Sequence, residues 1–375
     1  MQRYKLKSVI LILLIFFIFG LNVKAADITF NMDLEENLNR KLQFKVNKLN
    51  LPDFNVRGIY VTGWTAGMTD KMNRLVNLVN NTVINAMVID IKDINGFLSY
   101  KSKIGLVSEI NSSREKIKDI KKTINRLHNE GIYVIGRIVV FKDKLLARSR
   151  PDLALRLHYK NTNKVFISDS WVEPGEKEVH DYNINIAREA LLLGFDEIQF
   201  DYIRYPALAN KPYKVLMDDL LLKEDIINDF VAEAVHKLKY LDKPISIDVF
   251  GLTTTVNDDM GIGQNFNKLS KTIDIISPMV YPSHYAPGTY GIKLPENEPY
   301  QIVYNSMSDA IKKLSGQKNI NIRPWLQDFS LKQKYTSEDI LKQIEALKFF
   351  NIDEWLLWNP RSIYTEKALD ISLHR

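Results

Sequence analysis

The 375-residue sequence contains no cysteine. Disulfides and cysteine-based zinc sites are therefore excluded, and the hydrophobic core alone must hold the chain together. The six histidines show neither H-x-H nor H-E-x-x-H spacing, which disfavours a metal catalyst, although calcium bound by carboxylates stays open. G-x-G-x-x-G and G-x-S-x-G motifs are also missing, so neither a dinucleotide site nor a serine nucleophile is indicated. We expect no cofactor and no metal.

A dense basic stripe, as nucleic-acid binders carry, is lacking too. The excess positive charge lies at the N-terminus, where three basic residues precede an apolar run over 9–19 and small residues lead to Ala25. This pattern predicts a signal peptide over 1–25, because the run is shorter than the roughly 20 residues of a membrane span. Its removal takes away four basic and no acidic residues, which lowers the formal charge from +6 to +2. We expect a secreted or cell-envelope protein that binds no nucleic acid, with an uncleaved membrane anchor as the alternative.

Residues 26–55 have a loose Leu/Phe pattern, which predicts a linker or helical extension, and the main domain is expected over 56–375. There, short β-branched runs alternate with longer amphipathic stretches, the pattern of a parallel sheet with crossover helices. Eight units in about three hundred residues predict an α/β fold of the (β/α)8 TIM-barrel type rather than an open doubly wound sheet. The predicted strands are 58–62, 86–91, 133–139, 197–200, 245–249, 273–279, 321–326 and 354–357.

Helical stripes such as Ile340, Ile344 and Leu347 separate these strands. Gly131 and Gly194 stand directly before two strands, where glycine suits a left-handed helix cap. Pro278 is a misfit inside the sixth strand, because a closed barrel has no edge at which a missing N–H is harmless. It predicts a bulge or an early end of that strand.

The active site of a (β/α)8 barrel lies at the carboxyl ends of its strands. At these ends the sequence combines aromatic rings, which stack on sugar faces, with polar groups that bind hydroxyls. A sugar cleft is therefore predicted, although a single Trp at a strand end is also typical of a hydrophobic plug under a loop. The predicted substrate-binding residues are Trp64, Asp90, Lys92, Arg137, Arg204, Tyr281, His284, Trp325, Gln327, Asp328, Trp358 and Asn359.

Glycoside hydrolysis commonly needs two carboxyl groups, one ionised and one protonated. Asp201 and Asp248 end the fourth and fifth predicted strands, which are neighbours in a barrel. We predict Asp201 as nucleophile, beside Arg137 and Arg204, and Asp248 as acid, provided that an apolar site raises its pKa. A structural ion pair of Asp201 with Arg204 is the alternative.

Two further charges are placed by strand alternation. Asp90 and Lys92 share one face of the second strand and are expected to pair in the barrel mouth. Asp328 is a reserve acid.

Five segments carry a resemblance to a known family. The segments GIYVT from Gly58, VIDIKD from Val88, QFDYIRYP from Gln199, IDVFG from Ile247 and ISPMVYP from Ile276 resemble the bacterial family described as a putative glycosyl hydrolase domain, over about 56–364. The resemblance implies a barrel related to the alpha-amylase-like glycosidases, in which an Asp after the fourth strand, here Asp201, is the nucleophile. Those enzymes carry Glu as the acid after the fifth strand, whereas this chain has Asp248.

The leading hypothesis is a glycoside hydrolase that cleaves a bacterial surface or extracellular polysaccharide with two carboxylates. The second is a non-catalytic barrel that binds glycans or organises the cell envelope. A metal-dependent deacetylase is a third, and it needs a histidine-rich mouth that the sequence does not supply. The first hypothesis requires that Asp201 and Asp248 face a common hollow.

Overall fold

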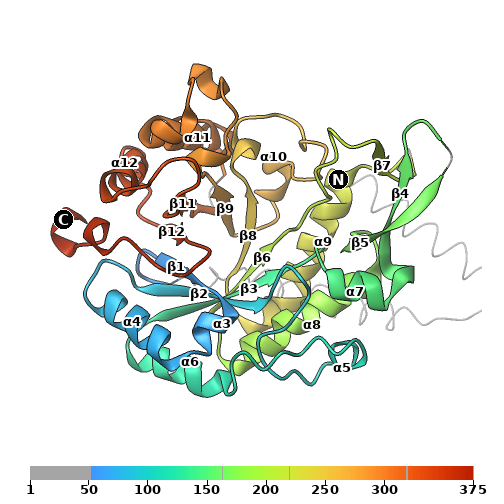
Figure 1. The fold of residues 1–375 in the computed structure, drawn as a ribbon, viewed down its shortest axis with the longest axis horizontal. Coiled ribbons are helices and arrows are strands. Elements are labelled where there is room, and N and C mark those ends of the chain that lie inside the picture. The colour runs from blue at the N-terminus through green and yellow to red at the C-terminus, as the bar shows by residue number, and fades with distance from the viewer. Residues whose placement is uncertain (1–51, 163, 219, 318–319, 375) are drawn as a thin grey trace, which may run out of the picture. The chain divides into compact units, whose positions relative to one another are not determined.

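The computed structural model describes residues 52–162, 164–218, 220–317 and 320–374. The predicted signal peptide and most of the predicted linker lie outside these residues. The main sheet closes on itself through parallel pairing of neighbouring strands, including the pairing of β8 with β9 (Figure 1). The predicted (β/α)8 barrel is thus confirmed. Its strands are β1 (Arg57–Val61), β2 (Ala86–Lys92), β3 (Tyr133–Val139), β6 (Glu197–Asp201), β8 (Ile245–Phe250), β9 (Ile275–Met279), the interrupted pair β10 (Asn321–Ile322) and β11 (Trp325–Gln327), and β12 (Trp355–Trp358).

Helices surround this barrel on the outside (Figure 1). The longer ones are α4 (Thr69–Asn80), α6 (Ile120–Asn129), α8 (Lys177–Leu193), α9 (Lys223–Leu238), α11 (Pro299–Leu314) and α12 (Ser337–Lys348). Shorter helices lie in the connections: α3 (Gly63–Ala66), α5 (Gly105–Glu109), α7 (Lys144–Ser149) and α10 (Phe266–Leu269). Short 3-10 turns are η1 (Pro151–Leu153), η2 (Lys239–Leu241), η3 (Gly251–Thr254), η4 (Pro282–His284), η5 (Thr289–Gly291), η6 (Pro295–Asn297), η7 (Glu366–Ala368) and η8 (Ile371–His374). Within the described ranges, no helix has the length and apolar character needed to cross a membrane.

The helix ends follow the sequence signals. Gly194 caps α8 with a φ of 119°, and Gly131 after α6 has a φ of 70°. Both are left-handed conformations that glycine adopts without steric cost. At the start of α12, Thr336 and Asp339 form a reciprocal capping box. The predicted glycine caps are therefore confirmed.

Strand β9 runs through Pro278 to Met279, so the expected early end of this strand is wrong. The irregularity lies in the neighbouring strand. Arg323 N donates to Ile276 O at 3.0 Å and Val280 N donates to Trp325 O at 3.1 Å, whereas the intervening bond would need the N–H that Pro278 lacks. The pairing is broken at that point, which separates β10 from β11.

Two apolar clusters stabilise the barrel. A large one lies between the strands and the helices and includes the predicted stripe of Ile340, Ile344 and Leu347. A smaller one fills the barrel interior with Tyr60, Val88, Ile135, Tyr281, Trp325 and neighbouring side chains. The interior is thus packed rather than open, and a ligand can bind only at its ends.

The loops after β3 and β6 add a small antiparallel sheet of β4 (Ala154–Tyr159), β5 (Val165–Val172) and β7 (Tyr213–Val215), in the order β5-β4-β7. This sheet projects beside the barrel (Figure 1). Trp171 at the end of β5 lies 6.1 Å from the ring of Tyr202, the residue after β6. The added sheet therefore extends the wall around the carboxyl ends of the strands.

Candidate active site

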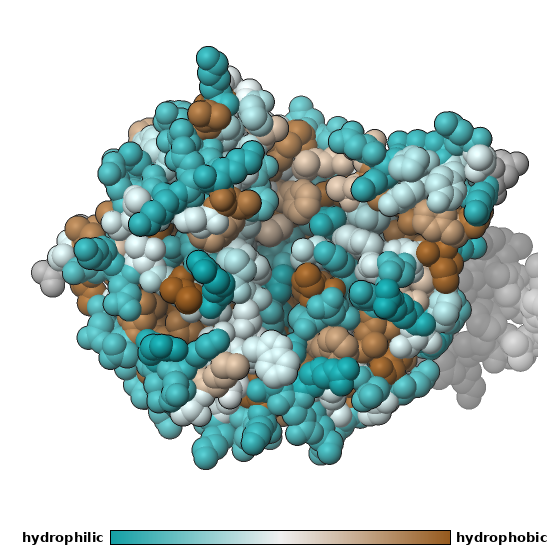
Figure 2. Space-filling view, viewed as in Figure 1, coloured by the Kyte–Doolittle hydropathy of each residue, from teal (hydrophilic) through white to brown (hydrophobic). Residues whose placement is uncertain are grey.

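A cavity of about 520 Å³ opens at the carboxyl ends of the strands. The space-filling view is hollowed near the centre of the same face (Figure 2). The lining comes from the ends of β3, β6, β8, β9 and β12 and from the loops that follow them. It consists of Arg137, Asp201, Tyr202, Arg204, Phe250, Gly251, Leu252, Met260, Met279, Tyr281, His284, Tyr285, Ala286, Thr289 and Trp358.

Asp201 is the only acidic residue in this lining among the described residues. Arg137 donates to its Oδ2 through Nε at 3.0 Å and through Nη2 at 2.5 Å. The same guanidinium donates through Nη1 to Asp90 Oδ1 at 2.6 Å, and the hydroxyl of Tyr60 donates to Asp90 Oδ2 at 2.5 Å. These charge-assisted bonds fix the Asp201 carboxylate at the wall of the cavity.

The backbone after β6 turns sharply to place the next side chain in the same cavity. Tyr202 has a φ of 54°, a left-handed conformation that is uncommon outside glycine and costs about 1 kcal/mol or more. Its N–H donates to Asp201 Oδ1 at 2.6 Å, and Phe141 N donates to its carbonyl at 3.3 Å. The turn therefore fixes the second oxygen of Asp201 and directs the Tyr202 ring to the cavity.

Close packing shapes the opposite wall. Gly251 lines the cavity, and a Cβ there would lie 2.4 Å from Met279 O and 2.5 Å from the hydroxyl of Tyr285. Only glycine fits this approach of the β8 and β9 loops. Gln264 holds the end of β8, since its Oε1 accepts from Phe250 N at 2.9 Å and its Nε2 donates to Asp248 O at 3.2 Å.

Asp248 lies on the strand next to Asp201, as predicted, but it is 1% exposed and does not line the cavity. The expectation that both acids face a common hollow is therefore wrong for Asp248. Trp325 Nε1 donates to its Oδ1 at 2.8 Å. Burial, followed by the negative charge of Asp201, raises the pKa of Asp248 well above its usual range, against the opposing effect of Arg137. Its protonated form is therefore favoured, which is the state that the acid role requires.

Tyr281 connects this buried layer with the cavity. It lines the cavity, and its hydroxyl is buried without a hydrogen-bond partner among the described residues. Burial and the charges of Asp248 and Asp201 raise its pKa, so the hydroxyl is a neutral donor. His284 lines the same side, and burial lowers its pKa.

Of the three predicted tryptophans, only Trp358 lines the cavity. Its ring stacks on Tyr60 at 3.9 Å, and the Arg137 guanidinium lies 5.1 Å from it. Trp325 is fully buried in the barrel interior, so its expected place in the cleft is wrong, and it acts on the site through Asp248. Trp64 is 59% exposed on α3, outside the lining.

The expected pairing of Asp90 with Lys92 is also wrong. A register shift between the two residues interrupts the pairing of β2 with β3. Lys92 then lies beside Ile138, and its Nζ donates to Asp143 Oδ2 at 2.8 Å and to Asn183 Oδ1 at 2.7 Å. The bulge thus turns Lys92 toward the helices, whereas Asp90 keeps its place inside the barrel.

Three predicted substrate-binding residues form contacts between loops at the rim of the barrel and do not line the cavity. Gln327 Oε1 accepts from Ser283 N at 3.1 Å, and Asn359 donates to the carbonyl of Asp328. Asp328 accepts from Thr365 N at 2.9 Å, and burial raises its pKa to about 6. None of Gln327, Asp328 and Asn359 lines the cavity, so their contacts hold loops together.

Arg204 lines the cavity as predicted, but it forms no ion pair with a described carboxylate. The predicted site residues did not include Tyr60 or Tyr202, nor the apolar lining residues from the loops after β8 and β9. Tyr60 lies inside β1, where a core role is the ordinary interpretation of a tyrosine. Tyr202 follows Asp201 directly, and that adjacency was the available signal.

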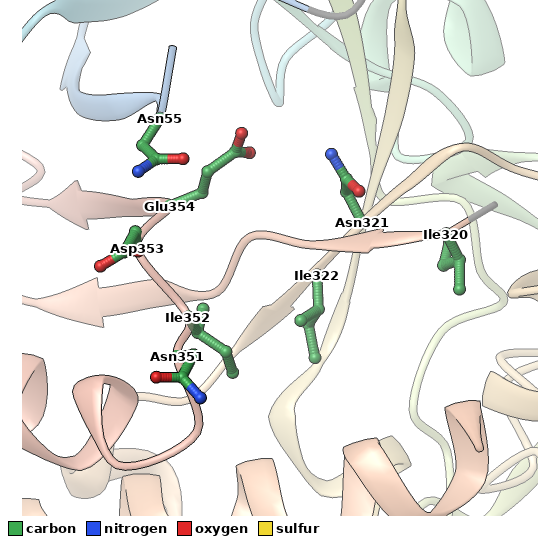
Figure 3. Close-up of a pocket in the computed structure, with 8 residues that line it drawn as sticks. All are labelled: Asn55, Ile320, Asn321, Ile322, Asn351, Ile352, Asp353 and Glu354. Atoms are coloured by element: carbon green, nitrogen blue, oxygen red, sulfur yellow. The ribbon is translucent and has the colours of Figure 1, made fainter. Parts of the chain in front are cut away.

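A second hollow, of about 280 Å³, lies at the opposite end of the barrel (Figure 3). It is formed where β1, β10 and β12 begin, by Asn55, Ile320, Asn321, Ile322, Asn351, Ile352, Asp353 and Glu354. In a (β/α)8 barrel this end serves stability. Over the described ranges, the structure contains no cluster of three or more potential metal ligands.

The chain resembles known proteins in its barrel fold. No curated protein matches the chain in sequence. Among solved structures, it resembles a hypothetical protein from Ruminiclostridium thermocellum, with 37% identity over 54% of this chain and 98% of that one and a TM-score of 0.43. It also resembles the PgaB (BpsB) glycoside hydrolase domain from Bordetella bronchiseptica, with 12% identity over 85% and 99% of the two chains and a TM-score of 0.61. An alpha-galactosidase from Thermus thermophilus matches at 13% identity over 86% and 62%, with a TM-score of 0.52.

The two more distant likenesses show the shared barrel alone. The family model described as "putative glycosyl hydrolase domain" matches residues 58–364, which is most of the chain and includes every lining residue of the cavity. The chain therefore belongs to the putative glycosyl hydrolase domain family.

Proposed function

We propose that the protein hydrolyses a bacterial surface or extracellular polysaccharide, with Asp201 as nucleophile and Asp248 as acid. The family gives the class of the enzyme, a hydrolase of glycosidic bonds. The observation that carries the assignment of residues is the position of Asp201, the single carboxylate that the described residues contribute to the lining of a cavity at the carboxyl ends of the strands. The extracellular location rests on the sequence prediction of a signal peptide.

The two carboxyl groups are in different states, as the reaction needs. The Asp201 carboxylate, held by Arg137, attacks the anomeric carbon while the bond to the leaving oxygen breaks. The leaving oxygen takes a proton that comes from Asp248, whose pKa is raised by burial. Because Asp248 does not line the cavity, this proton must pass through a group that lies between Asp248 and the substrate. Water then attacks the anomeric carbon of the glycosyl ester, its proton returns to Asp248, and Asp201 leaves as the ionised carboxylate. Trp358 and Tyr202 offer ring faces to the sugars.

The proposal is tested by incubating wild-type protein, Asp201→Asn and Asp248→Asn with a panel of bacterial exopolysaccharides and cell-wall glycans and measuring new reducing ends. We expect Asp201→Asn to lose roughly 10³-fold of the rate or more and Asp248→Asn about 10²- to 10⁴-fold. Asp328→Asn is the matched control, because this rim carboxylate lies outside the cavity lining. Equal product release from wild type and Asp201→Asn would remove Asp201 from the mechanism.

One observation favours a second candidate, a barrel that binds glycans without cleaving them. Asp248 lies behind the cavity wall, so the lining itself supplies one carboxyl group and not two. In that case glycans bind with no release of reducing ends, Asp248→Asn leaves binding unchanged, and Trp358→Ala abolishes it. The same panel, assayed for binding and for cleavage, separates the two functions.

A further inference from the structure

Arg204 is a buried cation that the reaction does not use. It is 9% exposed and lines the cavity. Its guanidinium lies 4.5 Å from the ring of Phe250, 4.9 Å from that of Tyr202 and 5.0 Å from that of Trp171. Its one hydrogen bond to a described residue runs from Nη1 to Tyr205 O at 2.9 Å. The charge is therefore surrounded by rings and a carbonyl instead of a carboxylate.

A second cation contacts the same Tyr202 ring. Lys142, in the loop between β3 and α7, has its Nζ 5.2 Å from the centre of the Tyr202 ring. No carboxylate of the described chain lies within ion-pair distance of Lys142 or Arg204. Burial, and next the positive charge of Arg204, lower the pKa of Lys142, while Asp201 partly opposes this. The two cations thus repel each other around Tyr202, and of the two only Arg204 lines the cavity.

Two other buried arginines of this chain have their positive charge paired with carboxylates. Arg137 bonds to Asp90 and Asp201, and Arg323 bonds to Glu197 and Glu354. Both oxygens of Asp201 are already occupied, by Arg137 and by Tyr202 N. Around Tyr202 there are then three cations, Arg137, Arg204 and Lys142, against the two paired carboxylates of Asp90 and Asp201. A buried charge without a partner is costly, and a bound anion would offset that cost.

We propose that the polysaccharide is acidic and that one of its negatively charged groups binds at Arg204 and Lys142, next to the sugar that Asp201 attacks. This inference deepens the proposed function and rests on it for the place of the glycan in the cavity. The rings of Trp171 and Tyr202 at the same edge fit the adjacent sugar face. A carboxylate, as in a uronic acid, and a phosphate substituent present the same anionic oxygens to a guanidinium and an ammonium.

The test measures binding separately from cleavage. Wild-type protein, Arg204→Met and Lys142→Met are applied at low temperature to an array of bacterial glycans that holds neutral, uronate-bearing and phosphate-bearing members. The best ligand is then compared by calorimetry with its carboxyl-reduced or dephosphorylated form. We expect wild type to bind the charged form about tenfold more tightly or better, as for one charge-assisted hydrogen bond, and both variants to lose most of that preference. The two chemical treatments distinguish carboxylate from phosphate.

Lys144→Met is the matched control, because this lysine lies two residues from Lys142 and acts on Asp169 instead of Tyr202. It should keep the wild-type preference. Lys142 is only partly buried, so its variant keeps the test valid if Arg204→Met fails to fold. Equal binding of charged and neutral forms, a preference that survives in both variants, or no bound glycan at all overturns the inference. Charge preference without cleavage contradicts only the hydrolase proposal, and cleavage of neutral glycans alone contradicts only this one.

Discussion

A buried arginine bridges two carboxylates at each end of the barrel, and the two arrangements differ in what surrounds them. At the base, Arg323 Nη1 donates to Glu197 at 2.9 Å and its Nε donates to Glu354 at 2.8 Å. Glu197 is fully buried and also accepts from the hydroxyl groups of Ser246 and Tyr133. Its charge is thus met entirely by protein groups.

At the carboxyl ends of the strands, the corresponding arginine and one of its two carboxylates border a cavity. Arg137 bridges Asp90 and Asp201, but Asp201 also lines a cavity. A third acid, Asp248, lies next to the pair without a cation of its own, and its pKa is raised. A buried arginine that bridges two carboxylates therefore does not by itself indicate a functional site. An unmade hydrogen bond does not distinguish the two ends either, because Arg323 Nη2 at the base is buried without a partner among the described residues. The functional end is distinguished by a carboxylate that lines a cavity and by a buried cation, Arg204, that is paired with no described carboxylate.

The strongest test of the difference between the two ends replaces Arg137 and Arg323 one at a time. We expect Arg137→Met and Arg323→Met each to lower the free energy of unfolding by about 3–5 kcal/mol, because both leave carboxylates buried without a partner. Only Arg137→Met should also lose activity per folded molecule, by about 10²-fold or more, since it frees Asp201. Denaturant unfolding and the initial rate of glycan cleavage measure the two effects.

Folded fractions are checked by circular dichroism before the rates are compared. If Arg323→Met loses as much activity per folded molecule as Arg137→Met, the division into a stabilising and a functional end is wrong.

The fold was predictable because its signals are local. Eight β-branched runs matched eight strand positions closely, and Gly194 marked the end of α8. Pro278 was correctly predicted to disturb the pairing of the sheet, but the interruption lies in the neighbouring strand, between β10 and β11. Pairing between β9 and β10 joins residues 46 positions apart, Asn321 with Ile275 and Ile322 with Ile276, and no local pattern contains it.

The site was predictable only as far as strand ends determine it. Asp201, Arg137 and Trp358 follow from alternation along ordinary strands. Lys92 was misplaced because a bulge reverses the direction of a side chain, and Trp325 because burial depends on how far a side chain reaches into the barrel. Both depend on three-dimensional packing that a count along the chain does not include.

The pH dependence of stability tests whether Asp248, at the functional end of the barrel, is protonated in the folded state. The folded-state pKa of Asp248 is raised above its unfolded value, so the folded state holds a proton that the unfolded state releases. Stability should therefore fall as the pH rises from about 4 toward the folded pKa, by at most about 1.4 kcal/mol per pH unit for one proton. Asp248→Asn removes the contribution of Asp248 to this decline, and urea unfolding across the pH range measures it.

The control is Asp274→Asn, just before β9 at the base, where burial raises the pKa to about 6. This variant should lose only the part of the decline between about pH 4 and 6. A wild-type decline that persists unchanged in Asp248→Asn contradicts a protonated Asp248.

The smallest expected effect tests whether Asp248 is the acid. Its hydrogen bond from Trp325 Nε1 stabilises the charged form and so lowers the pKa. Trp325→Phe removes that bond, and the alkaline limb of the kcat/KM profile should move to higher pH, with a change of roughly 2- to 10-fold in rate on that side. Trp355→Phe makes the same chemical change at the base of β12, away from Asp248, and should leave the profile in place. A limb that moves to lower pH, or moves equally in both variants, would show that the titration belongs to another group.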